Sequence, residues 1–242
     1  MDAVSSSMPL IALLGGSFNP PHAGHFRIAI ECAEALLPAE TLFVPCACPP
    51  HKSADNLLPF DFRVALLRAA LAEAGMDKSF GVCEVEGERS GPSYTADTLA
   101  ILSARRPGTR LAFIMGGEDY AQLATWRRWR ELPALADLVV LPRGERSRES
   151  FCDTTRSLWP EARKTQTPFP AVAEAFALPE GGRLLFLPQP LLDISSSMTR
   201  ERWLHGRRLD FLLPQSVQNL LRERESVVRQ LWGRFPKSAG CR

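Results

Sequence analysis

Short apolar runs alternate along the chain with longer stretches in which apolar residues recur at helical spacing. The runs are typical of buried strands and lie at 11–14, 41–44, 80–85, 110–115 and 138–141. The stretches between them predict helices at 26–37, 60–74 and about 95–105, and a short helix after 116. Strands and helices that alternate in this way form right-handed crossovers and a mostly parallel sheet. The pattern therefore predicts an α/β fold with an open, mostly parallel sheet and helices on both faces.

The chain beyond residue 141 is less regular. Residues 142–181 have poor periodicity and several prolines, so we interpret them as a surface insertion with a short helix at 171–178. A strand follows at 183–187, and a helix with a serine N-cap opens within 193–200. The last helix, at about 215–231, is amphipathic, and its buried stripe is Val217, Leu220, Leu221, Val228 and Leu231.

A glycine-rich stretch, 15–25, joins the first predicted strand to the first predicted helix and reads Gly-Gly-Ser-Phe-Asn-Pro-Pro-His-Ala-Gly-His. Glycine lets the backbone pass close to a bound group, and the free N–H groups at a helix start attract a phosphate. His22 and His25 would flank that phosphate with ring N–H donors. The alternative is an ordinary turn with incidental histidines, but two of the four histidines lie here beside Gly24, which favours a phosphate site.

Length and composition limit the classes of function. At 242 residues, with 45% hydrophobic and 23% charged residues, the chain can bury one substantial core. We expect a single domain over 9–232, with the insertion at about 142–181, a disordered tail at 1–8 and a flexible tail at 233–242. A net charge of +2 is too small to indicate a nucleic acid or an anionic membrane as partner.

The cysteines and the N-terminus predict a cytoplasmic protein. The six cysteines show no disulfide rhythm, and the N-terminus lacks the basic start and apolar core of a signal peptide. Cys46 and Cys48 form a C-x-C pair, but no second Cys/His pair stands at a matching spacing, so we expect no zinc site.

The glycine-rich stretch resembles the phosphate-binding loop and H-x-G-H signature of the nucleotidyltransferase superfamily, a Rossmann-like fold. The family pattern reads G-G-T/S-F-D-P-x-H-x-G-H, and only Asn19 departs from it. Four further segments are similar to the nicotinate-nucleotide adenylyltransferases, namely 49–52 (Pro-Pro-His-Lys), 93–99 (Ser-Tyr-Thr-Ala-Asp-Thr-Leu), 116–129 and 194–200 (Ile-Ser-Ser-Ser-Met-Thr-Arg). Glu118 stands where this family usually has aspartate.

The resemblance implies a role for each matching residue. Catalysis would fall to His22, His25, Lys52 and Arg200. ATP would be bound by Gly15, Gly16, Ser17, Phe18, Gly24, Ile194, Ser195, Ser196 and Ser197. The acceptor would be bound by Asn19, Ser93, Tyr94, Thr95, Gly116, Glu118 and Trp126, whereas Trp129 would belong to the core. Mg²⁺ would be bound through the ATP phosphates, because the loop offers no cluster of carboxylates.

The implied reaction is direct attack by the 5′-phosphate of nicotinate mononucleotide on the α-phosphorus of ATP. We find no serine or cysteine nucleophile with a base and no Walker-type loop, and a direct displacement needs neither. Nicotinamide mononucleotide or phosphopantetheine as acceptor stays open, although Trp126 and the Ser-Tyr-Thr turn count against pantetheine. A regulatory protein that has lost turnover through Asn19 and Glu118 is also open, as is a homo-oligomer. The expected geometry is that two helix starts, near Gly24 and Ser197, converge on one polyphosphate.

Overall fold

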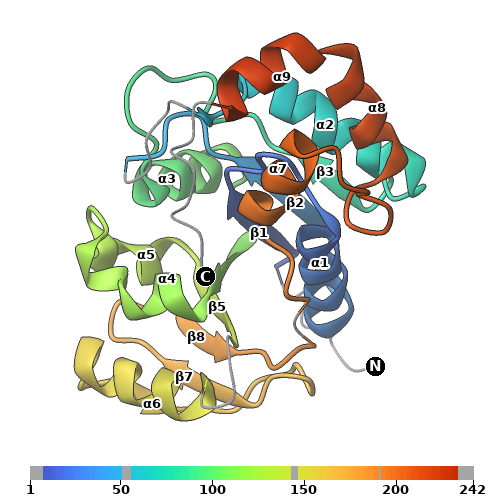
Figure 1. Ribbon diagram of the computed structural model, residues 1–242. Helices are drawn as coiled ribbons and strands as arrows, with labels where there is room; N and C mark the ends of the chain where they lie inside the picture. Colours follow the sequence, from blue (N-terminus) through green and yellow to red (C-terminus); the bar gives the residue numbers. More distant parts are fainter. Residues whose placement is uncertain (1–7, 51–55, 143–146, 191, 234–242) are drawn as a thin grey trace, which may run out of the picture. The chain divides into compact units, whose positions relative to one another are not determined.

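The computed structural model describes residues 8–50, 56–142, 147–190 and 192–233 (Figure 1). The strands are β1 (Leu10–Gly16), β2 (Glu40–Pro45), β3 (Phe80–Val82), β4 (Arg110–Gly116), β5 (Asp137–Leu141), β6 (Arg163–Lys164), β7 (Glu174–Ala177) and β8 (Arg183–Phe186). The α-helices are α1 (Ala23–Leu36), α2 (Phe60–Glu73), α3 (Thr95–Arg105), α4 (Gly117–Ala121), α5 (Leu132–Leu135), α6 (Ser147–Leu158), α7 (Ser196–Leu204), α8 (Gln215–Glu223) and α9 (Glu225–Trp232). Short 3-10 helices lie at Leu123–Thr125 and Trp129–Glu131.

The strands form one sheet in the order β3-β2-β1-β4-β5-β8-β7-β6. The pairs β1–β4, β4–β5 and β5–β8 are parallel, whereas β7 runs antiparallel to both β8 and β6. Every residue of β5 and the first five residues of β1 are buried, as expected for parallel strands covered on both faces. The predicted α/β fold with a mostly parallel sheet is confirmed.

The chain divides into two compact units, each built from three separate stretches. The first unit contains Met1–Gly15, Ala29–Leu42 and Tyr94–Leu191, and the second contains Gly16–Ile28, Phe43–Ser93 and Leu192–Arg242. The single domain expected over 9–232 stays a prediction. Lys52 and nearly all residues of the two predicted tails lie outside the described residues.

Helices α2, α7, α8 and α9 pack around the core of the second unit. Phe62 and Leu66 from α2 meet Val217 and Leu221 from α8, and Trp232 of α9 is fully buried among them. Figure 1 shows α2, α8 and α9 side by side. The single helix expected over 215–231 is wrong, because the chain breaks at Arg224 (φ −113°, ψ 30°) and continues as a second helix. Of the predicted buried stripe, Val217, Leu221 and Val228 are buried, whereas Leu220 and Leu231 are partly buried against the same core.

The segment 142–181 differs most from the sequence-based expectation. It contains a twelve-residue helix, α6, which the weak periodicity did not reveal. The short helix expected at 171–178 is wrong, because four of these residues form strand β7 and pair with β8. Pro170 and Pro179 leave room for barely two helical turns, so pairing with the neighbouring strands β6 and β8 satisfies the backbone better.

Smaller corrections concern element ends. Helix α1 begins at Ala23 rather than at residue 26, and β3 ends at Val82 rather than at residue 85. The N-cap of α3 is Tyr94, which makes no side-chain capping bond, rather than Ser93 or Thr95.

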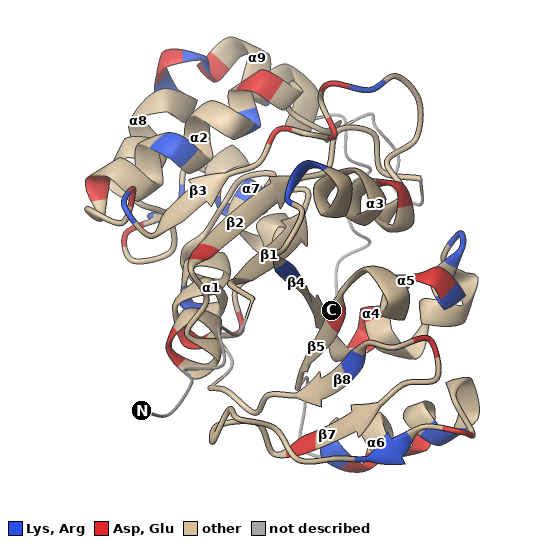
Figure 2. Cartoon of the chain, turned by 180° about the vertical axis from the view of Figure 1, so that it is seen from behind, with Lys and Arg blue, Asp and Glu red and all other residues tan. Residues whose placement is uncertain are grey.

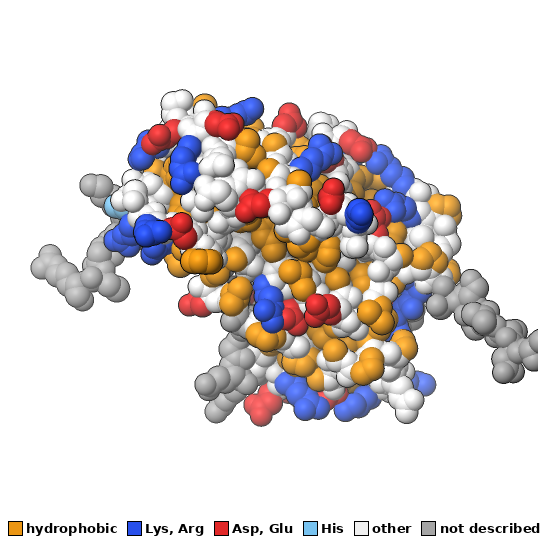
Figure 3. All heavy atoms as spheres, turned by 90° about the vertical axis from the view of Figure 1, so that its right-hand side faces the viewer, with side chains coloured by type: hydrophobic (Ala, Val, Ile, Leu, Met, Phe, Trp, Pro, Cys, Tyr) orange, Lys and Arg blue, Asp and Glu red, His pale blue; other side chains and the backbone are white. Residues whose placement is uncertain are grey.

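The described surface mixes charges of both signs. Figure 2 shows Lys, Arg, Asp and Glu interspersed along α6, α8 and α9, and Figure 3 shows the same mixture among apolar side chains on another face. In the described ranges, none of the helices combines the length and the apolar character that crossing a bilayer requires.

Candidate active site

The loop between β1 and α1 is folded tightly onto an aromatic side chain. Phe18 is fully buried and adopts a left-handed backbone conformation (φ 47°). A Cβ on Gly16 would lie 3.0 Å from Cζ of the Phe18 ring, so only glycine fits there without displacing that ring. The Phe18 ring centroid also lies 4.9 Å from that of His25, in an edge-to-face arrangement. The loop conformation and the position of His25 are therefore fixed by the same ring.

The two histidines of this loop stack on each other. Their ring centroids are 3.7 Å apart, with an angle of 29° between the ring planes. The backbone N–H of His22 donates to Nδ1 of His25 (3.2 Å), so the neutral His25 ring carries its proton on Nε2. Between them, a Cβ on Gly24 would lie 3.1 Å from Nδ1 of His22, which explains the glycine in H-x-G-H.

His22 is neutral at physiological pH. Its side chain is 4% exposed, and burial lowers its pKa from 6.5 to about 4. Nδ1 of His22 is buried without a hydrogen-bond partner among the described residues. An orphaned ring nitrogen of this kind is costly in a folded protein, and such groups concentrate at functional sites.

The start of α7 lies against this loop. Ser195 caps the helix by accepting a bond from the N–H of Met198 (3.2 Å), which confirms the predicted serine N-cap. The hydroxyl of Ser196 donates to the carbonyl of Pro20 (3.0 Å), and the carbonyl of Ile194 lies 3.5 Å from the position of a Cβ on Gly24. The two helix starts therefore lie in contact, as the sequence predicted.

Arg200 ties the two helix starts together. It is 8% exposed, its Nη1 donates to the carbonyl of Asn19 (2.7 Å), and its Nη2 donates to Oγ of Ser197 (2.9 Å). Burial lowers its pKa. Each of these nitrogens carries a second N–H, so the predicted contact with a phosphate is compatible with both bonds.

Asn19 is the residue that departs from the family pattern, and its side chain is buried (2% exposed). Its Oδ1 accepts from the N–H of Leu58 (3.1 Å) and from Nε1 of Trp232 (3.3 Å). Its Nδ2 donates to the carbonyl of Asn56 (2.8 Å). The amide is thus bonded to the protein on both sides, and the expected contact of Asn19 with the acceptor stays a prediction.

Several predicted acceptor residues lie in the first unit. Tyr94 and Thr95 form the start of α3, where the N-cap residue Tyr94 makes no side-chain capping bond. Trp126 is half-buried, and its ring meets that of Phe113 edge to face, with centroids 6.2 Å apart. The Arg127 guanidinium lies 4.7 Å from the centroid of the Tyr94 ring. Arg127 was not among the predicted acceptor residues, although a cation directly after Trp126 could have indicated a binding site for an anionic acceptor.

Other predicted residues are placed differently. Ser93 belongs to the second unit, and its hydroxyl accepts from the N–H of Cys48 (3.2 Å). Gly116 ends β4, directly before α4. Gly15 and Gly16 stand at the end of β1. Trp129 is 9% exposed and packs edge to face on Trp159, which confirms its assignment to the core.

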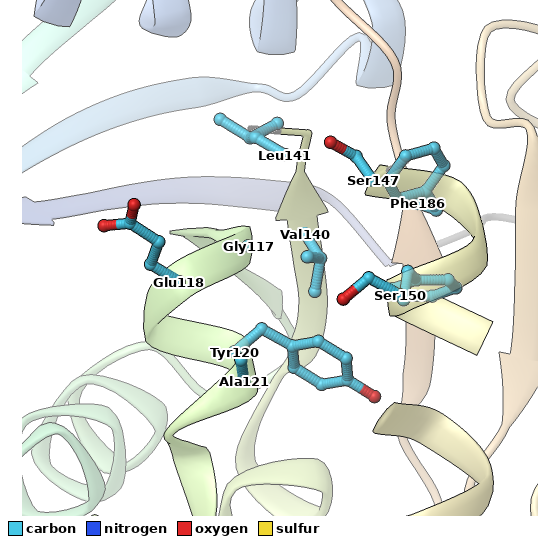
Figure 4. Close-up of a pocket in the computed structure, with 10 residues that line it drawn as sticks. Gly117, Glu118, Tyr120, Ala121, Val140, Leu141, Ser147, Ser150 and Phe186 are labelled. Atoms are coloured by element: carbon cyan, nitrogen blue, oxygen red, sulfur yellow. The ribbon is translucent and has the colours of Figure 1, made fainter. Parts of the chain in front are cut away.

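Glu118 lines a pocket of about 240 Å³ in the first unit. Figure 4 shows Glu118 and Tyr120 on α4, with Ser147 and Ser150 of α6 facing the end of β5 across the pocket. The hydroxyl of Tyr120 forms a hydrogen bond with Oγ1 of Thr155 (2.8 Å), so this hydroxyl already has a partner within the protein. Besides Tyr120, the polar side chains that line the pocket are Glu118, Ser147 and Ser150.

Comparisons with known proteins find relatives over most of the chain. The profile of the Cytidylyltransferase-like family matches residues 13–202. A probable nicotinate-nucleotide adenylyltransferase of Trichlorobacter lovleyi is 36% identical over 217 residues, which cover 88% of this chain and 97% of the relative. A protein of the same name from Syntrophotalea carbinolica is 35% identical over 87% of this chain and 94% of its own.

A solved structure extends the likeness to the fold. Nicotinic acid mononucleotide adenylyltransferase of Plasmodium falciparum, complexed with NaAD, superposes with a TM-score of 0.66 at 17% identity. The superposition covers 90% of this chain and 96% of that one. On the family profile and the two bacterial relatives, the chain belongs to the nicotinate-nucleotide adenylyltransferase family of nucleotide-transferring enzymes.

Proposed function

We propose that the chain transfers AMP from ATP to the 5′-phosphate of nicotinate mononucleotide, giving nicotinate adenine dinucleotide and pyrophosphate. A phosphate oxygen of the mononucleotide supplies the electron pair for a new bond to the α-phosphorus of ATP. The bond from that phosphorus to the bridging oxygen of the β-phosphate breaks, and pyrophosphate leaves with the electron pair. A displacement of this kind depends on positioning and on neutralisation of charge.

The observation that carries the proposal is the contact between the starts of α1 and α7. Helix starts bind phosphate through N–H groups that have no acceptor within the helix, and two of them here meet at one loop. Ser196 and Arg200 make this contact through the carbonyls of Pro20 and Asn19. A triphosphate that spans both helix starts would be held at two separate points, which orients its α-phosphate for attack.

The histidines would add donors to this site. His25 carries its proton on Nε2, so that nitrogen would donate to a phosphate oxygen. His22 is neutral before ATP binds, and a neighbouring triphosphate would favour its protonated form. We propose Lys52, which lies outside the described residues, as a further cation for the triphosphate.

We propose that Mg²⁺ enters with ATP as its phosphate complex. Within the described residues, no group of three or more His, Cys, Asp or Glu side chains is placed to hold a metal ion. Mg²⁺ commonly keeps several waters and binds through substrate phosphates. We therefore expect the phosphates of ATP, rather than protein side chains, to supply most of its ligands.

We propose the acid rather than the amide as acceptor. Arg127 adds positive charge next to Tyr94 at the start of α3, and a nicotinate carboxylate is anionic whereas the amide is neutral. Trp126 would supply an aromatic face for the pyridine ring. We place the enzyme in the cytoplasm, which is supported by the reduced state of Cys32, Cys46, Cys48, Cys83 and Cys152.

Pyrophosphate release, measured with Mg-ATP and each of three acceptors, tests the proposal. We expect turnover with nicotinate mononucleotide and a kcat/KM at least ten-fold lower with the amide. Faster turnover with nicotinamide mononucleotide or phosphopantetheine would replace the proposed acceptor. Binding of Mg-ATP without turnover on any acceptor would favour a regulatory protein.

A further inference from the structure

A buried arginine lies behind the phosphate loop and contacts it only through the backbone. Arg63 of α2 is fully buried, at 0% exposure. Its Nη1 donates to the carbonyl of Ser17 (2.7 Å), and its Nε donates to the carbonyl of Leu58 (2.9 Å). Since no part of Arg63 reaches solvent, an effect of its guanidinium on the reaction would be indirect, and these two carbonyls are its hydrogen-bond partners.

The bond to Ser17 fixes one peptide of the phosphate loop. In a trans peptide the C=O and the N–H point in opposite directions, so a carbonyl held by Arg63 turns the N–H of Phe18 away from Arg63. Phe18 has a positive φ of 47°, a conformation that costs energy for a side chain of this size and that the surroundings must enforce. Arg63 is the charged group that holds this peptide.

Arg63 also shares Leu58 with Asn19. The carbonyl of Leu58 accepts from Arg63, whereas its N–H donates to Oδ1 of Asn19. Both polar groups of one backbone residue are therefore bound by the residues that hold the loop at 17 and 19. This closed set of bonds joins the phosphate loop to the segment that begins at Asn56.

The buried guanidinium of Arg63 lies near Cys46 and Glu86. Burial lowers its pKa to about 10, and the nearby carboxylate of Glu86 opposes that shift, so the guanidinium is protonated at neutral pH. Glu86 is itself buried (8% exposed) and accepts from the N–H of Ala47 (3.2 Å). A buried cation is costly, and Nη2 of Arg63 has no partner among the described residues. Apolar packing alone would not require an arginine here.

We propose that Arg63 is a positioning residue for the nucleotide: its fork on the carbonyls of Ser17 and Leu58 sets the peptide that precedes the histidine pair. The proposal rests on the proposed function in that ATP is the ligand of this loop. The proposed role depends on the geometry of the two hydrogen bonds that Arg63 donates. An effect of its positive charge alone would be preserved by lysine.

The test compares Arg63→Lys with Arg68→Lys in the full chain. Arg68 lies on the same helix, its side chain is 62% exposed and paired with Glu84, and within the described residues it makes no hydrogen bond or ion pair with the loop. Lysine keeps the charge at position 63 but carries all its donors on one nitrogen, so it lacks the planar arrangement in which Nε and Nη1 of arginine reach two carbonyls. We expect Arg63→Lys to lower kcat/KM for Mg-ATP about 10- to 100-fold and to change KM for the mononucleotide less than two-fold. Arg68→Lys should match the wild type.

Circular dichroism shows whether Arg63→Lys folds. If it does not fold, the double variant Arg63→Met, Glu86→Gln removes both buried charges together. We expect the same decrease of kcat/KM for Mg-ATP in this double variant. Normal Mg-ATP kinetics in a folded Arg63→Lys or in the folded double variant would overturn the proposal.

Titration calorimetry with Mg²⁺ and a non-hydrolysable ATP analogue separates this inference from the proposed function. The measurement needs no acceptor, so it stands even if the wild type does not use nicotinate mononucleotide. Weaker analogue binding by Arg63→Lys than by Arg68→Lys supports the positioning role. Equal affinities in the two variants, or no binding by the wild type, would refute it.

Discussion

Acidification should destabilise the protein through His22 in a pH range where most carboxylates are still ionised. Burial holds the pKa of His22 at about 4 in the folded state, whereas the unfolded chain returns it to 6.5. Between these values the unfolded state binds more protons than the folded state, so stability falls as the pH falls below 6.5. The two pKa values give a loss of about 1.3 kcal/mol between pH 7.5 and 5.5, and about 2.5 kcal/mol by pH 4.5.

Urea unfolding at pH 7.5, 6.5 and 5.5 measures this loss when the wild type is compared with His22→Gln. Glutamine does not titrate, and the other histidines are common to both proteins, so their contributions cancel in the difference. We expect the wild type to lose about 1.3 kcal/mol more than the variant between pH 7.5 and 5.5. Parallel stability curves for the two proteins would mean that His22 has the same pKa in the folded and unfolded states, which would contradict the burial of its ring without a partner.

Three further predictions address the loop and the acceptor side. His25→Ala should lower kcat about 100- to 10,000-fold while the melting temperature hardly changes, and near-normal turnover would place the triphosphate elsewhere. Trp126→Ala should raise KM for the mononucleotide far more than KM for ATP; equal changes would remove Trp126 from the acceptor site. Asn19→Asp should cost about 1–3 kcal/mol in urea unfolding, because a carboxylate oxygen would replace the donor that now lies 2.8 Å from the carbonyl of Asn56. Unchanged stability would show that the Asn56 bond contributes little.

The sequence predicted those features that local patterns encode. Buried strands such as β1 and β5 are continuous apolar runs, and the loop after β1 combines glycines with a helix start, so both can be recognised within about ten residues. Helix α6 was missed because it is mostly polar and buries only Phe151 and Thr155. Strand β7 was mistaken for a helix because its pairing with β8 is a property of the sheet, which Glu-Ala-Phe-Ala does not reveal.

The contacts that hold the site were beyond the reach of sequence patterns. Asn19 meets Leu58 and Trp232 across 39 and 213 residues of sequence, and Arg63 meets Ser17 across 46. Such partners share no periodicity, so a sequence shows at most that a polar residue stands among apolar ones. Arg63 gave that signal, because it falls within the apolar face of its helix.

Asn19 stands where the family has aspartate, and its main-chain and side-chain hydrogen bonds have different roles. Arg200 holds this residue by its backbone carbonyl, which every amino acid provides, so the link between the two helix starts does not depend on the side chain. The side chain has a different task, since its amide bonds to the carbonyl of Asn56 and to the N–H groups of Leu58 and Trp232. An asparagine can serve all three partners as donor and acceptor, whereas an ionised aspartate only accepts. In this chain an amide therefore anchors the loop, while the contact between the helix starts runs through the backbone carbonyl of residue 19.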